Sequence, residues 1–401
     1  MKLGWIVGAL AMIAVIALAV PAGAQSPPPA AVASGTGLND VVNRLLSNNC
    51  AQLGLGPFGP DLSRLCPVGG PGTGSGSSSG GSVGSEGTAI SDEQRQLFRR
   101  LRQRQQQGAA SADPGNPLGV GVFVTTEYEK FNQDNTRFET GFDRDTVGMS
   151  FGADYLFRNG LILGAAFTYA HDFGDYDGVG GGFDHNSYGI LAYGSFQPIA
   201  NMFIDAVAGY TRKDYNFDRR AGIVLAGPSV AGSTHGDTNG NEWRIGVNSG
   251  YDFVFGAFTV GPRLGVLYRE TTMNDFKESG HTGLELAYSN QNIQSLTLRP
   301  GVYGSYAFST SWGVVIPQMT LEYVHEFLDD QRSVQFSFVQ DPQNRRFLFE
   351  TTPPDRDYMN LGVGVSMVLP SGLQPFLNFR DMLAYQDRNS YTVTLGLRIP
   401  F

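Results

Sequence analysis

Apolar and polar residues alternate with a period of two along most of the chain from about Leu118 to Phe401. The alternation is clearest in the last stretch, whose apolar positions are Tyr391, Val393, Leu395, Leu397, Ile399 and Phe401. The stretches 242–253, 258–269 and 359–367 show the same pattern. Because successive side chains of a β-strand point to opposite faces, the pattern predicts strands with one apolar face and one polar or glycine-rich face.

The lengths of the predicted strands and of their connections distinguish a membrane barrel from a water-soluble β-sandwich. The strands run for roughly 10–16 residues, whereas globular strands average about 5–6 and a tilted membrane strand needs about 9–11. Short turns are expected at 158–160, 198–201, 255–257, 309–311 and 370–372. Longer loops are expected near 130–145, 172–184, 218–240, 272–291 and 328–357. This asymmetry predicts an all-β fold, a transmembrane barrel of about 12 antiparallel strands over residues 115–401.

The composition agrees with this class. The chain carries 53 Gly and 12% aromatic residues, and only 16% of its residues are charged. A barrel with an apolar outside and a polar inside accounts for these values better than a soluble α/β enzyme does. The formal charge of −9 argues against nucleic acid as a partner, since phosphate binding needs a basic face.

The first 24 residues have the features of a secretory signal peptide. Lys2 is followed by an apolar run to Val20, and Pro21 breaks that run before Ala22-Gly23-Ala24. Small residues at these positions predict cleavage after Ala24. The alternative is an uncleaved membrane anchor, because the apolar run is nearly long enough to span a bilayer.

Residues 25–90 form a short segment rich in Gly, Ser and Pro, and we expect it to be mostly disordered. Its two cysteines, Cys50 and Cys66, are the only ones in the chain. In an exported protein such a pair is expected to form one disulfide, which would contribute about 3 kcal/mol.

A polar helix is predicted between this segment and the barrel, within residues 91–110. Ser91 is a good N-cap, acidic residues follow it in the first turn, and Gly108 ends the pattern. The helix carries Arg95, Arg99, Arg100, Arg102 and Arg104. It has little apolar face to bury, so it needs a polar tunnel or water around it.

Two stretches of the predicted barrel resemble the translocator barrel of autotransporters. They are residues 188–195, with the sequence YGILAYGS, and residues 298–327, which include RPGV, VIP and LEYVHEF. The resemblance covers about 285 residues, essentially the whole C-terminal part. It implies an outer-membrane protein of a Gram-negative bacterium, embedded in outer-membrane lipid as a monomer.

The resemblance also implies roles for the other segments. The alternating terminal strand ending in Phe401 is similar to the signal read by the barrel-assembly machinery, to which periplasmic chaperones deliver such chains. The helix before the first strand would thread the pore and tether an exported passenger, here residues 25–90, at the cell surface. This passenger is short for the family. Residues 94–107 contain no Asn, so self-cleavage at an Asn has no candidate nucleophile and we expect the passenger to stay attached.

Charge supports the placement of the helix inside the barrel. The acidic excess of the mature chain lies in the barrel region, where an Arg-rich helix would find charge-assisted hydrogen bonds. The candidate lumen-facing partners are Asp154, Glu242, Asp252 and Glu322. The alternative is that these acids pair with lumen residues such as Arg244 and Arg263.

No catalytic constellation is found in the sequence, and we expect neither an enzyme nor a cofactor. Gly76-Ser77-Ser78-Ser79-Gly80 matches a hydrolase elbow by letters, but it lies in the flexible segment without the strand and helix that the mechanism needs. The acidic residues and histidines of 171–185 could in principle bind a divalent cation. A solvated acidic loop is the commoner outcome, and we expect no metal site.

The predicted function is therefore an outer-membrane translocator that exports and anchors its own N-terminal segment. Two alternatives remain open at this stage. The barrel could be a porin-like channel with a periplasmic N-terminal segment, or it could be an adhesin that binds through its external loops.

Overall fold

The computed structural model describes residues 119–136, 138, 141–157, 159–177, 181–223, 230–369 and 372–400. It also describes two short strands, β1 (Val32–Ala33) and β2 (Gly80–Gly81), which pair with each other. The predicted signal peptide, the cysteine pair Cys50 and Cys66, and the helix within 91–110 lie outside the described residues.

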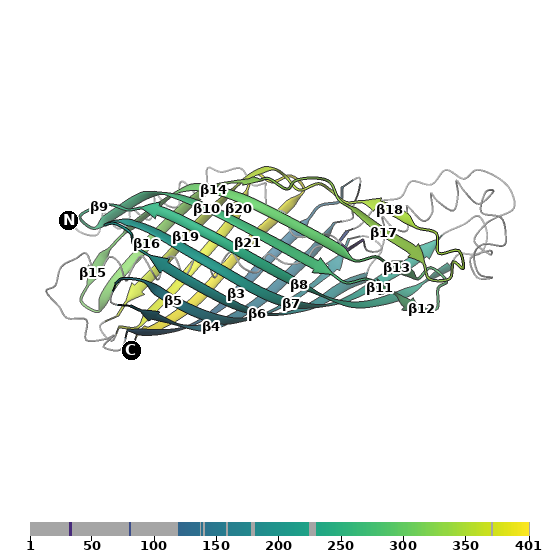
Figure 1. Cartoon of the computed structure of the whole chain (residues 1–401), viewed down its shortest axis with the longest axis horizontal. Helices are drawn as coiled ribbons and strands as arrows, with labels where there is room; N and C mark the ends of the chain where they lie inside the picture. The colour runs from purple at the N-terminus through teal and green to yellow at the C-terminus, as the bar shows by residue number, and fades with distance from the viewer. Residues whose placement is uncertain are drawn as a thin grey trace.

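Twelve long strands form a closed antiparallel barrel, as the sequence predicted (Figure 1). They are β3 (Val120–Gln133), β4 (Phe142–Leu156), β5 (Ile162–Tyr176), β6 (Gly181–Phe196), β7 (Met202–Ile223), β8 (Val230–Tyr251), β10 (Phe258–Met273), β14 (Gln291–Tyr306), β16 (Gly313–Glu326), β19 (Asp357–Val368), β20 (Gln374–Leu383) and β21 (Arg388–Pro400). Each strand pairs with the next, and β21 pairs with β3 from Arg388↔Gln133 to Pro400↔Gly121. Closure leaves the barrel without a free edge.

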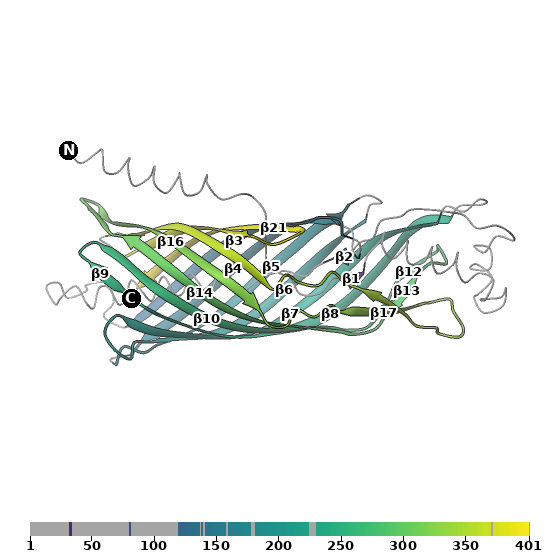
Figure 2. The same ribbon diagram turned by 90° about the horizontal axis from the view of Figure 1, so that it is seen from above.

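The two ends of the barrel differ in their connections, as Figures 1 and 2 show. At one end the strands are joined by the predicted short turns, two of which continue as the hairpin strands β9 (Phe253–Phe255) and β15 (Phe308–Thr310). Gly160 and Gly256 have positive φ angles of 80° and 62° in these turns, where glycine is the least strained residue. We call this the short-turn end and the opposite one the loop end.

Two of the five expected loops are much shorter than predicted, because the strands run past the membrane. β7 and β8 each span 22 residues, so only residues 224–229 remain of the expected loop 218–240. Similarly, only residues 177–180 separate β5 from β6. Beyond Tyr210 the outward positions of β7 are polar, and this hides the apolar alternation by which strands are recognised in a sequence.

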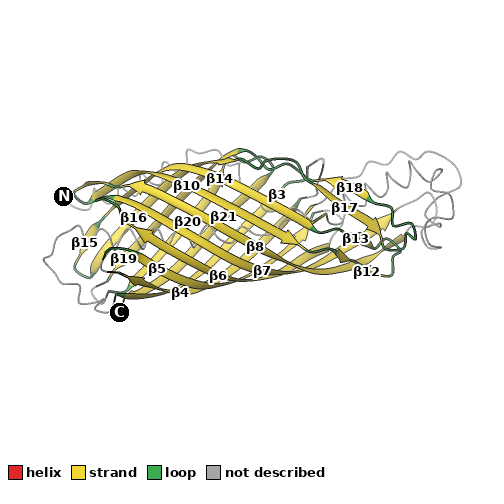
Figure 3. Ribbon diagram, viewed as in Figure 1, coloured by secondary structure: helices red, strands yellow, loops and turns green. Residues whose placement is uncertain are grey.

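The side chains of the barrel are arranged inside out. Large apolar side chains face outward and are exposed, among them Phe151 (59%), Ile190 (64%) and Ile245 (57%). Charged side chains such as Glu242 and Arg398 face inward and are buried. A water-soluble sheet would have the reverse arrangement, so the outward face is matched to lipid. Figure 3 shows strands and loops throughout the described part, and no described helix has the length and hydropathy of a membrane span.

A second, smaller sheet lies at the loop end (Figure 1). It is built from β11 (Phe276–Lys277), β13 (Leu286–Tyr288), β17 (Ser333–Phe338) and β18 (Phe347–Glu350), in that order. β12 (Ser279–Gly280) pairs instead with the outer part of β8. These strands come from the loops that connect β10 to β14 and β16 to β19. We call the four-stranded sheet the loop sheet. The alternation of apolar and polar residues did not predict it.

Candidate translocation pore and its membrane face

An ion pair crosses the closing seam of the barrel near the short-turn end. Arg398 of the last strand reaches over Gly121 of the first strand and binds Asp154 of the second. A Cβ at Gly121 would lie 1.9 Å from an Arg398 nitrogen, so only glycine leaves room for the Arg398 side chain to cross the strand. Tyr193 also donates a hydrogen bond of 3.3 Å to Asp154. The last strand is thereby tied to the first hairpin through side chains as well as through the backbone.

Charges of alternating sign line the wall of β3, β4 and β5 further toward the loop end. Arg144 donates a hydrogen bond of 2.6 Å to Glu129 and lies 3.9 Å from Asp172. Thr146 donates a further hydrogen bond to Asp172. Each of these side chains is buried on the inward face, where an unpaired charge would be costly.

The row continues on β7 and β8. Lys213 lies 3.0 Å from Glu242, and Arg244 donates to the other oxygen of Glu242 at 2.8 Å. Thr271 donates to Glu242 at 3.2 Å. The carboxylate therefore has charged or polar partners from three strands, β7, β8 and β10.

A third cluster lies nearer the short-turn end. Arg263 of β10 binds Asp252, and its guanidinium stacks on the rings of Phe203 and Tyr303 at 4.9 and 4.8 Å. Stacking of this kind holds a guanidinium in a fixed plane. Glu322 of β16 is also inward and buried, opposite Asn360 of β19.

All four acids chosen from the sequence, Asp154, Glu242, Asp252 and Glu322, are thus buried on the inward face. Asp154, Glu242 and Asp252 pair with basic residues of the barrel wall, the arrangement considered above as the alternative. The helix arginines lie outside the described residues, so their pairing with these acids stays a prediction.

Several other inward charges were not among the lumen residues predicted from the sequence. They are Glu129, Arg144, Asp172, Lys213 and Arg398. Each occupies the same parity as the glycines and small polar residues of its strand, and this parity was the signal that could have identified them.

The outward face carries a band of tyrosines toward the loop end. Each tyrosine hydroxyl donates a hydrogen bond to a carboxylate or amide oxygen. The acceptor residue lies on the same strand or on the neighbouring one, two residues closer to the loop end than the tyrosine. These pairs are Tyr128–Asp145 (2.5 Å), Tyr169–Asn186 (2.8 Å), Tyr210–Asn241 (2.7 Å), Tyr268–Glu270 (3.2 Å) and Tyr323–Asp357. A ring on the apolar side and a hydroxyl on the polar side suit the interface between acyl chains and headgroups.

The terminal strand agrees with its predicted parity. Tyr391, Leu395 and Ile399 are exposed on the outward face, while Thr394 and Arg398 are buried on the inward face. Phe401 lies outside the described residues.

The residues 171–185, considered as a possible cation site, are divided between the two faces of the wall. Asp172 and His185 are inward and buried, whereas His171 and Asp184 are outward and lie 3.5 Å apart. Within the described ranges no group of three or more His, Cys, Asp or Glu side chains could hold a metal ion.

A closed antiparallel barrel with an apolar outer face, an interfacial tyrosine band and a charged inner wall defines an outer-membrane β-barrel protein. The family model described as the Autotransporter beta-domain matches residues 122–380, so the chain belongs to the autotransporter β-domain family.

The relatives of this chain are distant. It is 27% identical over 262 residues to the esterase EstA from Pseudomonas aeruginosa, a match that covers 64% of this chain and 38% of the esterase. It is 28% identical over 219 residues to the protein YaiT from Escherichia coli, covering 53% of this chain and 21% of that protein. The chain therefore spans well under half the length of the relatives it matches.

The fold is similar to a solved structure, the translocator domain of the autotransporter NalP from Neisseria meningitidis. The TM-score is 0.55 at 13% identity, and the match covers 79% of this chain and 100% of that one. The family resemblance and the all-β barrel fold predicted from the sequence are confirmed. The chain is an autotransporter translocator barrel of the Gram-negative outer membrane.

Proposed function

We propose that the barrel exports its N-terminal segment and anchors it at the cell surface. Residues 1–24 direct export and are removed, residues 25–90 lie outside, and the helix within 91–110 occupies the lumen. The barrel of 115–401 then remains as a monomeric anchor in outer-membrane lipid. Periplasmic chaperones and the barrel-assembly machinery, which reads the terminal strand, deliver and insert it.

The observation that carries this proposal is where the first strand begins. Val120 pairs with Tyr155, next to the short turn that joins β4 to β5, so β3 starts at the short-turn end, which faces the periplasm in barrels of this class. A lumen helix that leads into β3 must therefore run from the loop end to the short-turn end. A helix of this length covers about 20 Å, which brings the chain before it close to the outer mouth.

The charged wall supports the same placement. Rows of inward acids and bases offer an arginine-rich helix many charge-assisted hydrogen bonds in a low-dielectric lumen. A catalytic role for residues 25–90 is not part of the proposal. EstA is an esterase, but its match spans only 38% of its own length, and residues 25–90 lack a recognisable catalytic arrangement.

Trypsin added to intact cells tests the placement. Residues 25–90 contain two sites, after Arg44 and after Arg64, and no lysine. We expect cleavage at both sites when intact cells are treated. A reducing gel is needed because the predicted Cys50–Cys66 disulfide would hold together the fragments on either side of the cut after Arg64. The double variant Arg44→Gln/Arg64→Gln is the matched control and should resist. Cleavage only after the outer membrane is permeabilised would place the segment in the periplasm and favour the channel alternative.

A further inference from the structure

The inner wall changes character at the loop end. Further from this end the inward face mixes charged side chains and glycines with smaller apolar groups of residues, but here it carries the largest cluster of rings, Phe131, Phe142, Phe183, Tyr215 and Phe217, all buried. Phe131 stacks on Phe142 at 5.6 Å, and Phe142 meets Phe183 at 5.8 Å. A lumen open to water at this level would expose these rings, so something apolar must cover them.

The loop sheet provides that cover. Phe217 of the wall stacks on Phe276 of β11 at 5.8 Å, and Phe276 stacks on Tyr288 of β13 at 4.7 Å. The contacts continue from Tyr288 to Phe336 of β17 at 6.5 Å. Wall and loop sheet thus form one apolar core, in which Leu286 of β13 is completely buried.

The loops that build the sheet reach across the mouth. β16 and β19, which carry β17 and β18 between them, are separated from β6 and β7 by three or more strands in either direction around the barrel. The far side of the loop 327–356 also meets the β3–β4 connection, where Thr136 and Thr352 lie 2.7 Å apart. The sheet is therefore held at several points of the rim.

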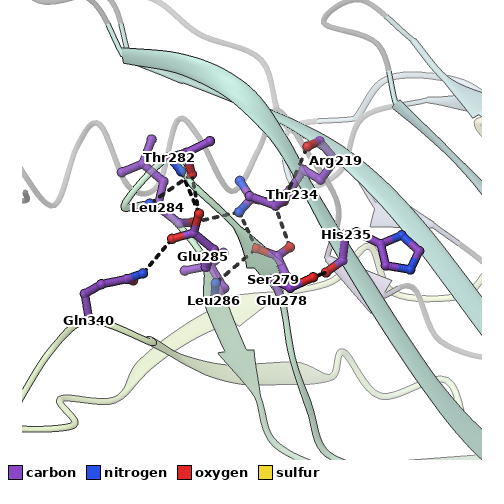
Figure 4. A network of polar contacts seen from close by, with 10 residues as sticks. All are labelled: Arg219, Thr234, His235, Glu278, Ser279, Thr282, Leu284, Glu285, Leu286 and Gln340. Atoms are coloured by element: carbon purple, nitrogen blue, oxygen red, sulfur yellow. Dashed lines mark hydrogen bonds and ion pairs between the residues drawn. The ribbon is translucent and has the colours of Figure 1, made fainter.

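One buried ion pair fastens the sheet to the wall (Figure 4). Arg219 of β7 donates to both carboxylate oxygens of Glu278, at 2.8 and 2.5 Å, and to the Leu284 carbonyl at 2.8 Å. Glu278 also accepts the Leu286 backbone N–H at 3.0 Å. A bidentate contact of this kind fixes both distance and orientation.

A second carboxylate connects the two loops of the sheet to each other (Figure 4). Glu285 accepts hydrogen bonds from the Thr282 backbone N–H at 2.7 Å and from Gln340 at 2.6 Å. Gln340 follows β17, so the loop sheet is fastened internally as well as to the barrel.

We infer that the loop sheet is an external lid over the β3–β10 side of the barrel mouth, and that the Arg219–Glu278 pair holds it docked there. The lid covers the cluster of inward aromatic side chains at the loop end, which would otherwise be exposed to water. Removing one partner of the pair would leave the other charge buried and unpaired. The equilibrium between the docked and the undocked lid should then shift by about a hundredfold or more toward the undocked state. This inference does not depend on where residues 25–90 lie.

A cysteine probe beneath the lid tests the inference in whole cells that carry the full chain. Ala221 is inward on β7, two residues beyond Arg219, and fully buried in the shared core. Ala221→Cys, in a Cys50→Ser/Cys66→Ser background, is labelled with a membrane-impermeant maleimide. We expect slow labelling with the pair intact, and labelling at least about tenfold faster after Arg219→Gln or Glu278→Gln.

The control is another ion pair on the same strand. Arg212 lies 3.6 Å from Asp214 on the exposed outward face, and Arg212→Gln should leave the labelling rate unchanged. Phe276→Ser removes the apolar contact and should also accelerate labelling. Barrel integrity in every variant is checked by heat-modifiable migration on gels. Fast labelling with the pair intact would show that the lid does not cover Ala221. Unchanged labelling after Arg219→Gln would show that the pair does not hold the lid. Either result overturns the inference.

Discussion

Glycines on the inner wall make room for large neighbouring side chains, which explains much of the glycine content. A Cβ at Gly164 would lie 2.3 Å from the Tyr193 ring, and a Cβ at Gly396 would lie 2.1 Å from the Phe376 ring. Each ring therefore lies across the backbone of the adjacent strand. The sequence showed glycines on one parity, but it could not show which side chain fills each space.

This packing predicts a specific cost for Gly164→Ala. The added methyl must displace the Tyr193 ring, and overpacking of this kind costs about 1–3 kcal/mol. Urea unfolding of the barrel in lipid vesicles measures the change. Gly304→Ala is the matched control, because nothing lies within 4 Å of its Cβ position. Equal stability of the two variants would contradict the packing described here.

The seam ion pair makes a second prediction at this scale. Asp154→Asn leaves the buried Arg398 guanidinium without its carboxylate and should destabilise the barrel by about 3 kcal/mol or more. Lys130→Gln breaks a partly exposed pair with Asp145 at 3.0 Å on the outward face and should cost under about 1 kcal/mol. The same unfolding assay compares them. A loss for Asp154→Asn no larger than that for Lys130→Gln would exclude a seam role.

Individual strands present one face to lipid and one to the lumen, and this predicts how substitutions along a strand behave. Ile245→Arg places a charge on the outward face of β8 within the apolar band and should cost about 2–4 kcal/mol. Asn216→Arg, also outward but beyond the tyrosine band on β7, should be tolerated. Folding yield into vesicles of defined thickness measures both. Equal tolerance would contradict the assigned membrane boundary.

The lid sheet predicts a pH dependence. Burial alone would raise the pKa of Glu285, but hydrogen bonds from Thr282 and Gln340 outweigh it and hold the pKa below its usual value. Such a group stabilises the docked lid above the pKa of about 4.5 that it has when undocked, and the stabilisation is lost as the pH falls through the lower docked value. Amide-exchange protection factors of β13 should decrease across that range. Glu285→Gln should remove this component; an unchanged profile in the variant would assign the dependence to other groups.

At the level of elements, the sequence predicted the membrane-spanning strands well because their outward positions are uniformly apolar. It did not predict the extensions of β5–β8, whose outward residues are mostly polar, or the loop sheet. β11, β13 and β18 have two to four residues each, too few for a periodic pattern to be recognised. Their pairing depends on contacts between loops far apart in the sequence.

The whole molecule combines a lipid-matched exterior with a charged interior wall. The even strand number and the alternation of short and long connections could be read from the sequence because closure and topology impose them. Two partners of inward acids, Arg244 and Arg263, were named from the sequence as an alternative, but most partners could not be predicted because they depend on strand register. Glu242, for example, finds Lys213 on a neighbouring strand 29 residues away.

The different environments of alternate residues are tested most directly by spin labels placed one at a time at 146–151 of β4, in lipid vesicles. Oxygen, which concentrates in acyl chains, should relax labels at the outward sites Val147, Met149 and Phe151 strongly. Labels at the inward sites Thr146 and Ser150 should show little effect. An absence of this alternation, or outward labels reached equally well by a water-soluble nickel complex, would contradict the barrel described here.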